Sequence, residues 1–236
     1  MAVWADIYPL VADQAYLAPK GMVSSHAKRA VTVFLQRTGL WREALDAFDL
    51  VVGTEEYTLT PPADAQITGL VSVKCGGREL NVFSGGSWPY GSQKTGWPCF
   101  WKFEGTTTLL LYPIPHQNLI EGMDVVARCV PSREATSFPD WLMDEWSEVL
   151  ADGVLSTLLM GKEKPWADTA LALHYAREFK KGMARARIKD AKSGAQTGLR
   201  VRQQRYGDAK GSFRSIGSDN TETIFTSETV LDGGDA

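Results

Sequence analysis

The sequence has 236 residues, of which 44% are hydrophobic and 22% are charged, with a net charge of −3 at pH 7. This size allows one large domain or two small ones, and the hydrophobic content is sufficient for a packed core. The cysteines, Cys75, Cys99 and Cys129, have no CxxC spacing, which argues against a zinc site and a disulfide framework. No apolar run approaches the ~18 residues of a membrane span, and the start lacks a signal-peptide pattern. We therefore expect a protein that folds in a reducing cytoplasm.

Residues 1–48 predict two helices. The first runs from Ile7 to Leu17, and the second from Met22 to Arg37 carries an apolar face and is closed by Gly39. Trp41 is expected to pack into the helical core. His26 is interpreted as an ordinary partly buried histidine, because no second metal ligand lies at helical spacing from it.

From Asp49 the pattern changes to short β-branched runs separated by turn residues. The expected strands are Val51-Val52, Glu56–Leu59, Ile67–Lys74, Arg78–Phe83, Gly96–Gly105, Thr106–Tyr112 and Met123–Val130. Gly76-Gly77 predicts a tight hairpin turn. We therefore expect an antiparallel β-sheet or sandwich over residues 49–131, and the lack of β-α-β alternation argues against a Rossmann-like fold.

A glycine-rich loop, Ser84–Ser92, lies inside this β region. Its spacing fits neither a phosphate-binding loop nor a nucleophile elbow. Two interpretations remain, a long flexible loop or a contact loop. In the second, Trp88, Pro89 and Tyr90 contact a partner protein or a neighbouring subunit, since Trp and Tyr often anchor protein interfaces.

Residues 132–192 predict a pair of helices. Pro139 suits the start of the first, and Gly161 is expected to end it in a left-handed conformation. Asp168 is the expected N-cap of the second helix, and Trp166 in the corner between them is expected in the core. The residues at helical spacing that form the apolar face of the first helix are Leu142, Trp146, Val149, Leu150, Val154 and Leu158. The carboxylates of this helix match a solvated face better than a paired hydrolase site.

Residues 193–236 are polar and contain few large apolar side chains, so this segment is either a disordered tail or an arm that orders on a partner. The residues proposed to dock on that partner are Leu199, Arg200, Arg202, Arg205, Tyr206, Lys210, Phe213, Arg214, Ile224 and Phe225. The whole sequence thus predicts an α+β fold. A helical bundle is formed by residues 1–48 and 132–192, with the β insert between them and an extended C-terminal arm.

Three groups of motifs carry a resemblance to a known family. The first is FLQRTGLWRE, residues 34–43. The second lies in the β region and consists of EYTLTPPAD, VSVKCGGREL, GWPCFWKFEG and LLLYPIP. The third is DEWSEVLADG and KPWAD in the helix pair. In this order the chain resembles the head-to-tail adaptor (connector) proteins of short-tailed phages, including the tail tubular protein A-like members.

The resemblance implies a non-enzymatic virion protein without cofactors or a membrane partner. Such adaptors form a ring of usually about twelve copies, a dodecamer, at the head–tail junction, where closed rings arise from repeated contacts between copies. The implied partners are the portal protein, a tail nozzle or tail tube protein, and further copies of the chain. Genomic DNA passes through the channel during ejection without sequence-specific binding. The C-terminal arm is expected to dock on the portal, and assembly is expected in the host cytoplasm.

Two other classes of function remain open. The segment Arg177–Arg214 has twelve Lys and Arg against three Asp and Glu, which is compatible with a nucleic-acid-binding module. A tail-associated cell-wall hydrolase is the less favoured alternative, because the sequence has no recognisable nucleophile, metal set or paired acid.

The mild negative net charge suits a channel in which DNA slides, because a strongly basic lumen would hold phosphates.

Overall fold

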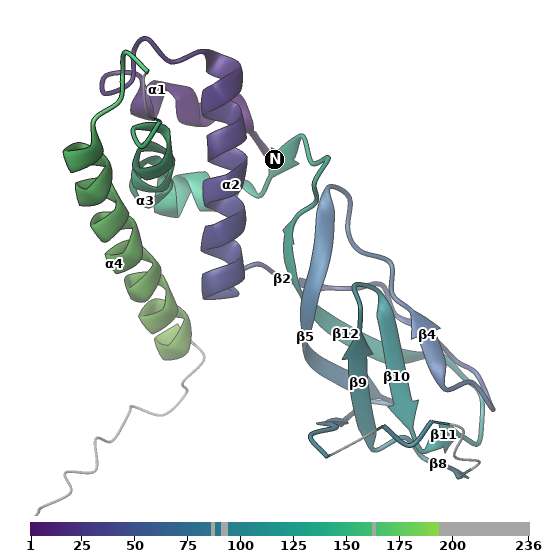
Figure 1. The fold of residues 1–236 in the computed structure, drawn as a ribbon. Coiled ribbons are helices and arrows are strands. Elements are labelled where there is room, and N and C mark those ends of the chain that lie inside the picture. The colour runs from purple at the N-terminus through teal and green to yellow at the C-terminus, as the bar shows by residue number, and fades with distance from the viewer. Residues whose placement is uncertain (86–87, 91–93, 162–163, 194–236) are drawn as a thin grey trace, which may run out of the picture. The chain divides into compact units, whose positions relative to one another are not determined.

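The structure is a computed structural model that describes residues 1–85, 88–90, 94–161 and 164–193 (Figure 1). These residues belong to one compact unit, Met1–Gly194. The unit combines helices with several β-sheets, which confirms the predicted α+β class. The C-terminal arm, 193–236, lies almost wholly outside the described residues.

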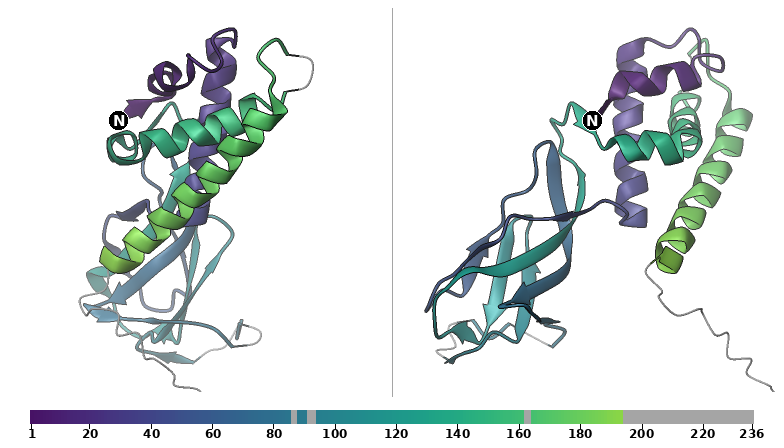
Figure 2. Two further views of the ribbon diagram at one scale, coloured as in Figure 1. Left: turned by 90° about the vertical axis from the view of Figure 1, so that its left-hand side faces the viewer. Right: turned by 180° about the vertical axis from the view of Figure 1, so that it is seen from behind.

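The helical elements occupy the two ends of the described chain (Figures 1 and 2). They are a 3-10 helix at Trp4–Ile7, α1 at Tyr8–Val11, α2 at Lys20–Thr38, α3 at Asp140–Leu158 and α4 at Thr169–Ser193. The prediction of α2 is confirmed, including its end at Gly39, where φ is +67°. The predicted helix from Ile7 to Leu17 is wrong, because α1 ends at Val11. Tyr16 and Leu17, which would have extended its apolar face, are exposed and offer no packing to continue it.

Helix α3 packs against both α2 and α4 (Figure 2). The apolar face predicted for it is buried, except that Val149 is half-buried. Phe34 of α2 lies with its ring centroid 5.7 Å from that of Trp146 and 6.4 Å from that of Phe179, so one aromatic ring contacts both other helices. Two glycines allow α3 and α4 to approach each other closely. A Cβ at Gly182 would lie 2.4 Å from a methyl group of Val149, and a Cβ at Gly153 would lie 2.8 Å from the ring of Phe179.

The junction between α3 and α4 departs in part from the prediction. Asp168 is the N-cap of α4 as expected, since its carboxylate accepts a 2.9 Å hydrogen bond from the Leu171 N–H. Gly161 does not adopt the predicted left-handed conformation. The Leu159 carbonyl accepts a 3.1 Å hydrogen bond from the Asp168 N–H, so the end of α3 is satisfied without that conformation. Trp166 is half-buried against the core instead of lying inside it.

The larger sheet has the strand order β2-β12-β5-β6, and β3 also pairs with β12. Its strands are β2 at Arg42–Ala44, β3 at Phe48–Leu50, β5 at Ala65–Cys75, β6 at Arg78–Glu79 and β12 at Leu119–Pro131, all paired antiparallel. The predicted tight turn at Gly76-Gly77 is confirmed, because both glycines have positive φ, +55° and +76°. The first strand of this sheet begins at Arg42, before the expected border at Asp49. The predicted strand at Val51-Val52 is absent, and both of these residues are exposed.

A second sheet has the order β4-β10-β9-β7, with β4 at Glu56–Thr58, β7 at Asn81–Val82, β9 at Phe100–Glu104 and β10 at Thr108–Tyr112. It is not wholly antiparallel as predicted, because β7 and β9 pair in parallel. Only Leu80 separates β6 from β7. Its N–H bonds the Val73 carbonyl in the first sheet, while the next N–H, of Asn81, bonds the Cys99 carbonyl beside the second. The chain thus changes sheets within one residue, and this sets the direction of β7.

Two small sheets complete the fold. One consists of β8 at Thr95–Gly96 and β11 at Ile114–Pro115, paired in parallel. The other consists of β1 at Ala2–Val3 and β13 at Ser137–Phe138, paired antiparallel within the two segments expected to be helical. The β region also contacts the helical part of the chain. Arg42 of β2 forms a 2.5 Å ion pair with Asp190 of α4, and the Cys129 N–H donates a 2.9 Å hydrogen bond to the Trp41 carbonyl in the link between α2 and β2.

Candidate functional site

The described residues provide little for metal or nucleophilic chemistry. They contain no group of three or more His, Cys, Asp and Glu side chains that could hold a metal ion. Cys75 and Cys129 are buried free thiols, and burial raises the pKa of the Cys129 thiol to about 11, which disfavours the reactive thiolate. His26 Nδ1 lies 2.9 Å from the Thr157 hydroxyl and is half-buried, as the sequence interpretation expected. Within the same residues, no helix has the length and apolar character of a membrane span.

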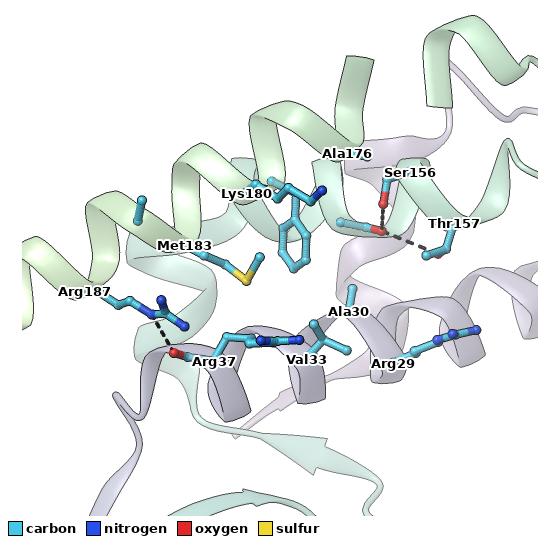
Figure 3. Close-up of a pocket in the computed structure, with 13 residues that line it drawn as sticks. Arg29, Ala30, Val33, Arg37, Ser156, Thr157, Ala176, Lys180, Met183 and Arg187 are labelled. Carbon is cyan, nitrogen blue, oxygen red and sulfur yellow. Dashed lines mark hydrogen bonds between the residues drawn. The ribbon is translucent and has the colours of Figure 1, made fainter. Parts of the chain in front are cut away.

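A groove of about 570 Å³ lies between α2, α3 and α4 (Figure 3). Arg29, Val33 and Arg37 line it from α2. Lys180 and Arg187 are among the residues that line it from α4. Arg29, Val33 and Arg37 are spaced four residues apart, so they lie along one side of α2. The groove therefore runs along two helices that are far apart in the sequence.

Four cations surround this groove, and we call the surface formed by Arg29, Arg37, Lys180 and Arg187 with its floor the cationic groove. All four side chains are exposed. Arg187 donates a 2.7 Å hydrogen bond from Nε to the Arg37 carbonyl at the end of α2. None of the four forms an ion pair with a carboxylate within the described part of the chain. Their positive charge is therefore uncompensated locally.

The floor of the cationic groove is apolar. Ala30, Val33, Phe179 and Met183 line it, and Ala30 and Phe179 are buried. Gly153 of α3 also belongs to it, and the lack of a side chain there keeps the groove open between Ala30 and Phe179. An apolar floor inside a cationic rim suits a ligand that presents apolar groups flanked by carboxylates.

A second charged surface lies on α3 and α4 and includes no residue of the cationic groove. Burial, with the nearby charges of Glu178 and Glu148, raises the pKa of the Asp152 carboxyl to about 6, and His174 acts against this. We call Glu148, Asp152 and Glu178 the acidic flank. Glu178 forms a 2.7 Å ion pair with exposed Lys181, and its pKa is lowered mainly by that hydrogen bond.

The predicted contact loop is only partly available for contacts. Trp88 is 3% exposed, its Nε1 donates a 2.6 Å hydrogen bond to Glu55, and its ring packs edge-on against Phe83 and Tyr112. Its indole therefore belongs to the packing of the β region and is not free to anchor an interface. Pro89 is half-buried, and Tyr90 is 62% exposed with its hydroxyl bonded to Glu104. A contact role for Tyr90 stays a prediction.

The predicted docking residues of the C-terminal arm, from Leu199 to Phe225, lie outside the described residues, and their role stays a prediction. Sequence reasoning missed the cationic groove. The available signal was the spacing of Arg29, Val33 and Arg37 on a helix whose opposite side is apolar. That signal did not reveal that Lys180 and Arg187 lie across the groove from Arg29 and Arg37, because this depends on how α2 and α4 pack in the folded protein.

Comparison with known proteins gives one family. A family model described as SU10 adaptor protein matches residues 23–202, a span that includes nearly all of α2, the β region, α3 and α4. Comparison with curated proteins gives no match.

Proposed function

We propose, because the chain belongs to the SU10 adaptor protein family, that it is a phage virion protein that joins the portal to the tail as a head-to-tail adaptor. The family match is the observation that carries this proposal. An adaptor of this kind is a structural protein, and its work is to hold partners in a fixed arrangement. An adaptor binds these partners through its exposed surface, so its grooves and charged faces are the features from which its function can be inferred.

The finer parts of the proposal follow the resemblance to tail tubular protein A-like adaptors of short-tailed phages. Copies of the chain form a ring, a dodecamer, around the channel through which DNA leaves the head. Residues 1–48 and 132–192 act as the ring-forming helical domain, and residues 49–131 act as an insert that meets the tail nozzle or tail tube protein. The arm 193–236 docks on the portal. The close packing of α2, α3 and α4 supports the first of these roles, because a ring needs a rigid repeating block.

Electron microscopy tests the proposal directly. The purified full chain is mixed with portal rings of the same phage, and class averages are compared with those of portal rings alone. We expect an added ring of density on one face of the portal, with a symmetry that gives the number of copies. Portal rings that stay bare when the chain is in large excess contradict the adaptor function.

A nucleic-acid-binding module is the second candidate, and the cationic groove is the specific observation in its favour. Binding to phosphates weakens steeply as salt rises, because counterions released on binding are replaced. Fluorescence anisotropy with a labelled 30-base-pair duplex, about three turns of DNA, at rising salt distinguishes the two functions. Tight binding at low salt that is lost at moderate salt favours the nucleic-acid module, and negligible binding throughout favours the adaptor.

A further inference from the structure

We propose that the cationic groove receives the acidic flank of a second copy of this chain. The inference rests on the proposed ring and identifies the two surfaces that meet between neighbouring copies. Each surface is formed by described residues of the helices.

The two surfaces lie on different sides of α4. Lys180 and Arg187 are seven residues apart, which is close to two helical turns, so they share one side of the helix. Glu178 precedes Lys180 by two residues and is therefore turned by about 200° around the helix axis. On α3, Asp152 interacts with Glu178, His174 and Glu148, and none of these four residues lines the groove. One copy can thus present the groove to one neighbour and the flank to another.

This arrangement has the geometry of a head-to-tail interface. A patch that is complementary to itself produces a closed dimer, whereas two different complementary patches produce a ring or a filament. On one side are four cations that form no ion pair with a carboxylate among the described residues, and on another are the carboxylates Glu148 and Asp152, so the two sides are complementary in sign. The ion pair of Glu178 with exposed Lys181 does not prevent this, because exposed pairs are weak and exchange partners readily.

Three occupants are compatible with the four cations of the groove: the acidic flank of a second copy, a phosphate-bearing ligand such as DNA, and another acidic segment of this chain. Residues 217–236 contain five Asp and Glu and no Lys or Arg, so they form another acidic segment of the same chain. The acidic flank is favoured because it is held on the same rigid helices as the groove and repeats with them in every copy. Both other occupants are outcomes of the test.

Cysteine crosslinking between two differently marked chains tests the contact while keeping every charge of the two surfaces. Ala184→Cys marks the groove in one chain, and His174→Cys, beside Asp152, marks the flank in the other. The chains are mixed at the concentration at which wild-type protein assembles, alone or on portal rings, and are oxidised mildly. We expect a covalent dimer on a non-reducing gel, about tenfold above a control pair in which Lys74→Cys, exposed on β5, replaces the flank marker. Chains with one marker each, tested alone, give the background of the native cysteines.

Charge reversal shows whether the contact is the proposed one. Arg29→Glu with Arg37→Glu in the groove-marked chain should reduce the dimer at least tenfold, and Glu148→Lys with Asp152→Lys in the flank-marked chain should restore it. Thermal melts establish that the variants fold. If the reversed chains melt early, Arg29→Gln with Arg37→Gln and a salt series replace them, with the dimer expected to fall as salt rises.

Several results overturn the inference while leaving the proposed function intact. Rings that form on the portal without the crosslink, or with a crosslink insensitive to charge reversal and salt, place the interface elsewhere. Stronger crosslinking of Ala184→Cys to Thr229→Cys than to His174→Cys assigns the groove to the acidic end of the chain. Loss of the crosslink on addition of the DNA duplex, together with DNA binding that Arg29→Glu abolishes, assigns the groove to nucleic acid. A chain that never joins the portal contradicts the proposed function. In that case, the crosslink between copies that are free of the portal still shows whether the groove meets the acidic flank.

Discussion

The environment of Asp152 opposes its negative charge, because burial and two neighbouring glutamates favour the protonated carboxyl. Its pKa in the folded state is about 6, above the ordinary value of 3.8. The folded state therefore binds a proton that the unfolded chain has already released over the window between these values. The stability that this proton contributes is fully present below about pH 4 and is lost as pH rises through about 6.

The first prediction follows from the raised pKa of Asp152, which makes the folded state less stable as pH rises. Asp152→Asn removes the titration, so its melting temperature should rise relative to wild type between about pH 4 and about pH 7.5. Thermal melts of both proteins across this window, followed by circular dichroism, measure the difference. Asp124→Asn, at an exposed strand position, is the control for the loss of one carboxylate from the surface and is melted at the same pH values. A constant difference at all pH values would show that the fold does not raise the pKa of Asp152.

The second prediction concerns Trp88, which packs into the β region through Phe83, Tyr112 and Glu55. Trp88→Ala should lower the free energy of unfolding by about 3–5 kcal/mol, as truncations of buried aromatic residues do. Trp88→Phe should cost less, since it keeps an aromatic ring and loses the hydrogen bond. Urea unfolding of both variants measures this order. Tyr90→Ala, at the exposed neighbour, is the control, and an equal loss there would contradict the different roles of the two residues.

At the scale of elements, the approach of α4 to α3 depends on Gly182. A Cβ at this position would lie 2.4 Å from one methyl group of Val149 and 2.7 Å from the other. Both methyl groups are on a short branched side chain that has little freedom to move in a helix. The usual stabilisation of about 1 kcal/mol on replacing a helical glycine with alanine is therefore reversed here.

Gly182→Ala should consequently lower the free energy of unfolding by about 1–3 kcal/mol, the usual cost of overpacking. Gly21→Ala, in the first turn of α2, is the matched control, because a Cβ added there would have no atom within 4 Å beyond its chain neighbours and the backbone of its own helix. It should be neutral or slightly stabilising. Denaturant melts of the two variants decide the prediction, which fails if Gly182→Ala is as stable as Gly21→Ala.

The elements themselves were largely predictable from local pattern. The helical spacing from Leu142 to Leu158 and the glycine pair at the β5–β6 turn identified α3 and the hairpin, because these signals act within a few residues. The parallel pairing of β7 with β9 was not predictable, since it depends on the change of sheet at Leu80. The burial of Trp88 was not predictable for a similar reason. A glycine-rich segment indicates a loop but does not indicate whether the aromatic side chain within it turns inward.

The two candidate surfaces required tertiary structure. The sequence showed an acidic first helix and a basic second helix in the 132–192 pair. It did not show that the lysines and arginines of α4 divide between the groove and the opposite side. Only the packing of α2 beside α4 brings Arg29 and Arg37 to Lys180 and Arg187. Helix faces can be read from spacing, but the pairing of faces cannot.

At the scale of the whole molecule, the last prediction concerns the segment after α4. A chain ending at Ser193 keeps every described element, so it should remain folded with a melting temperature close to that of the full chain. We expect it to lose co-sedimentation with portal rings at moderate salt, because the proposed docking residues are removed. Full-length protein carrying Tyr90→Ala is the control and should still bind. Equal binding by the shortened chain would show that the arm is not the docking element.

The position of α2 far ahead of α3 has a consequence for how the protein is made. The residues between Thr38 and Asp140, which include nearly the whole β region, leave the ribosome before the helix against which α2 packs. At roughly 5–20 residues per second, several seconds pass during which α2 contacts the 3-10 helix and α1 that precede it but lacks α3. Such a nascent helix is a target for chaperones and for association with other nascent chains. Slower synthesis or lower temperature during expression should therefore change the yield of soluble protein more than its final stability.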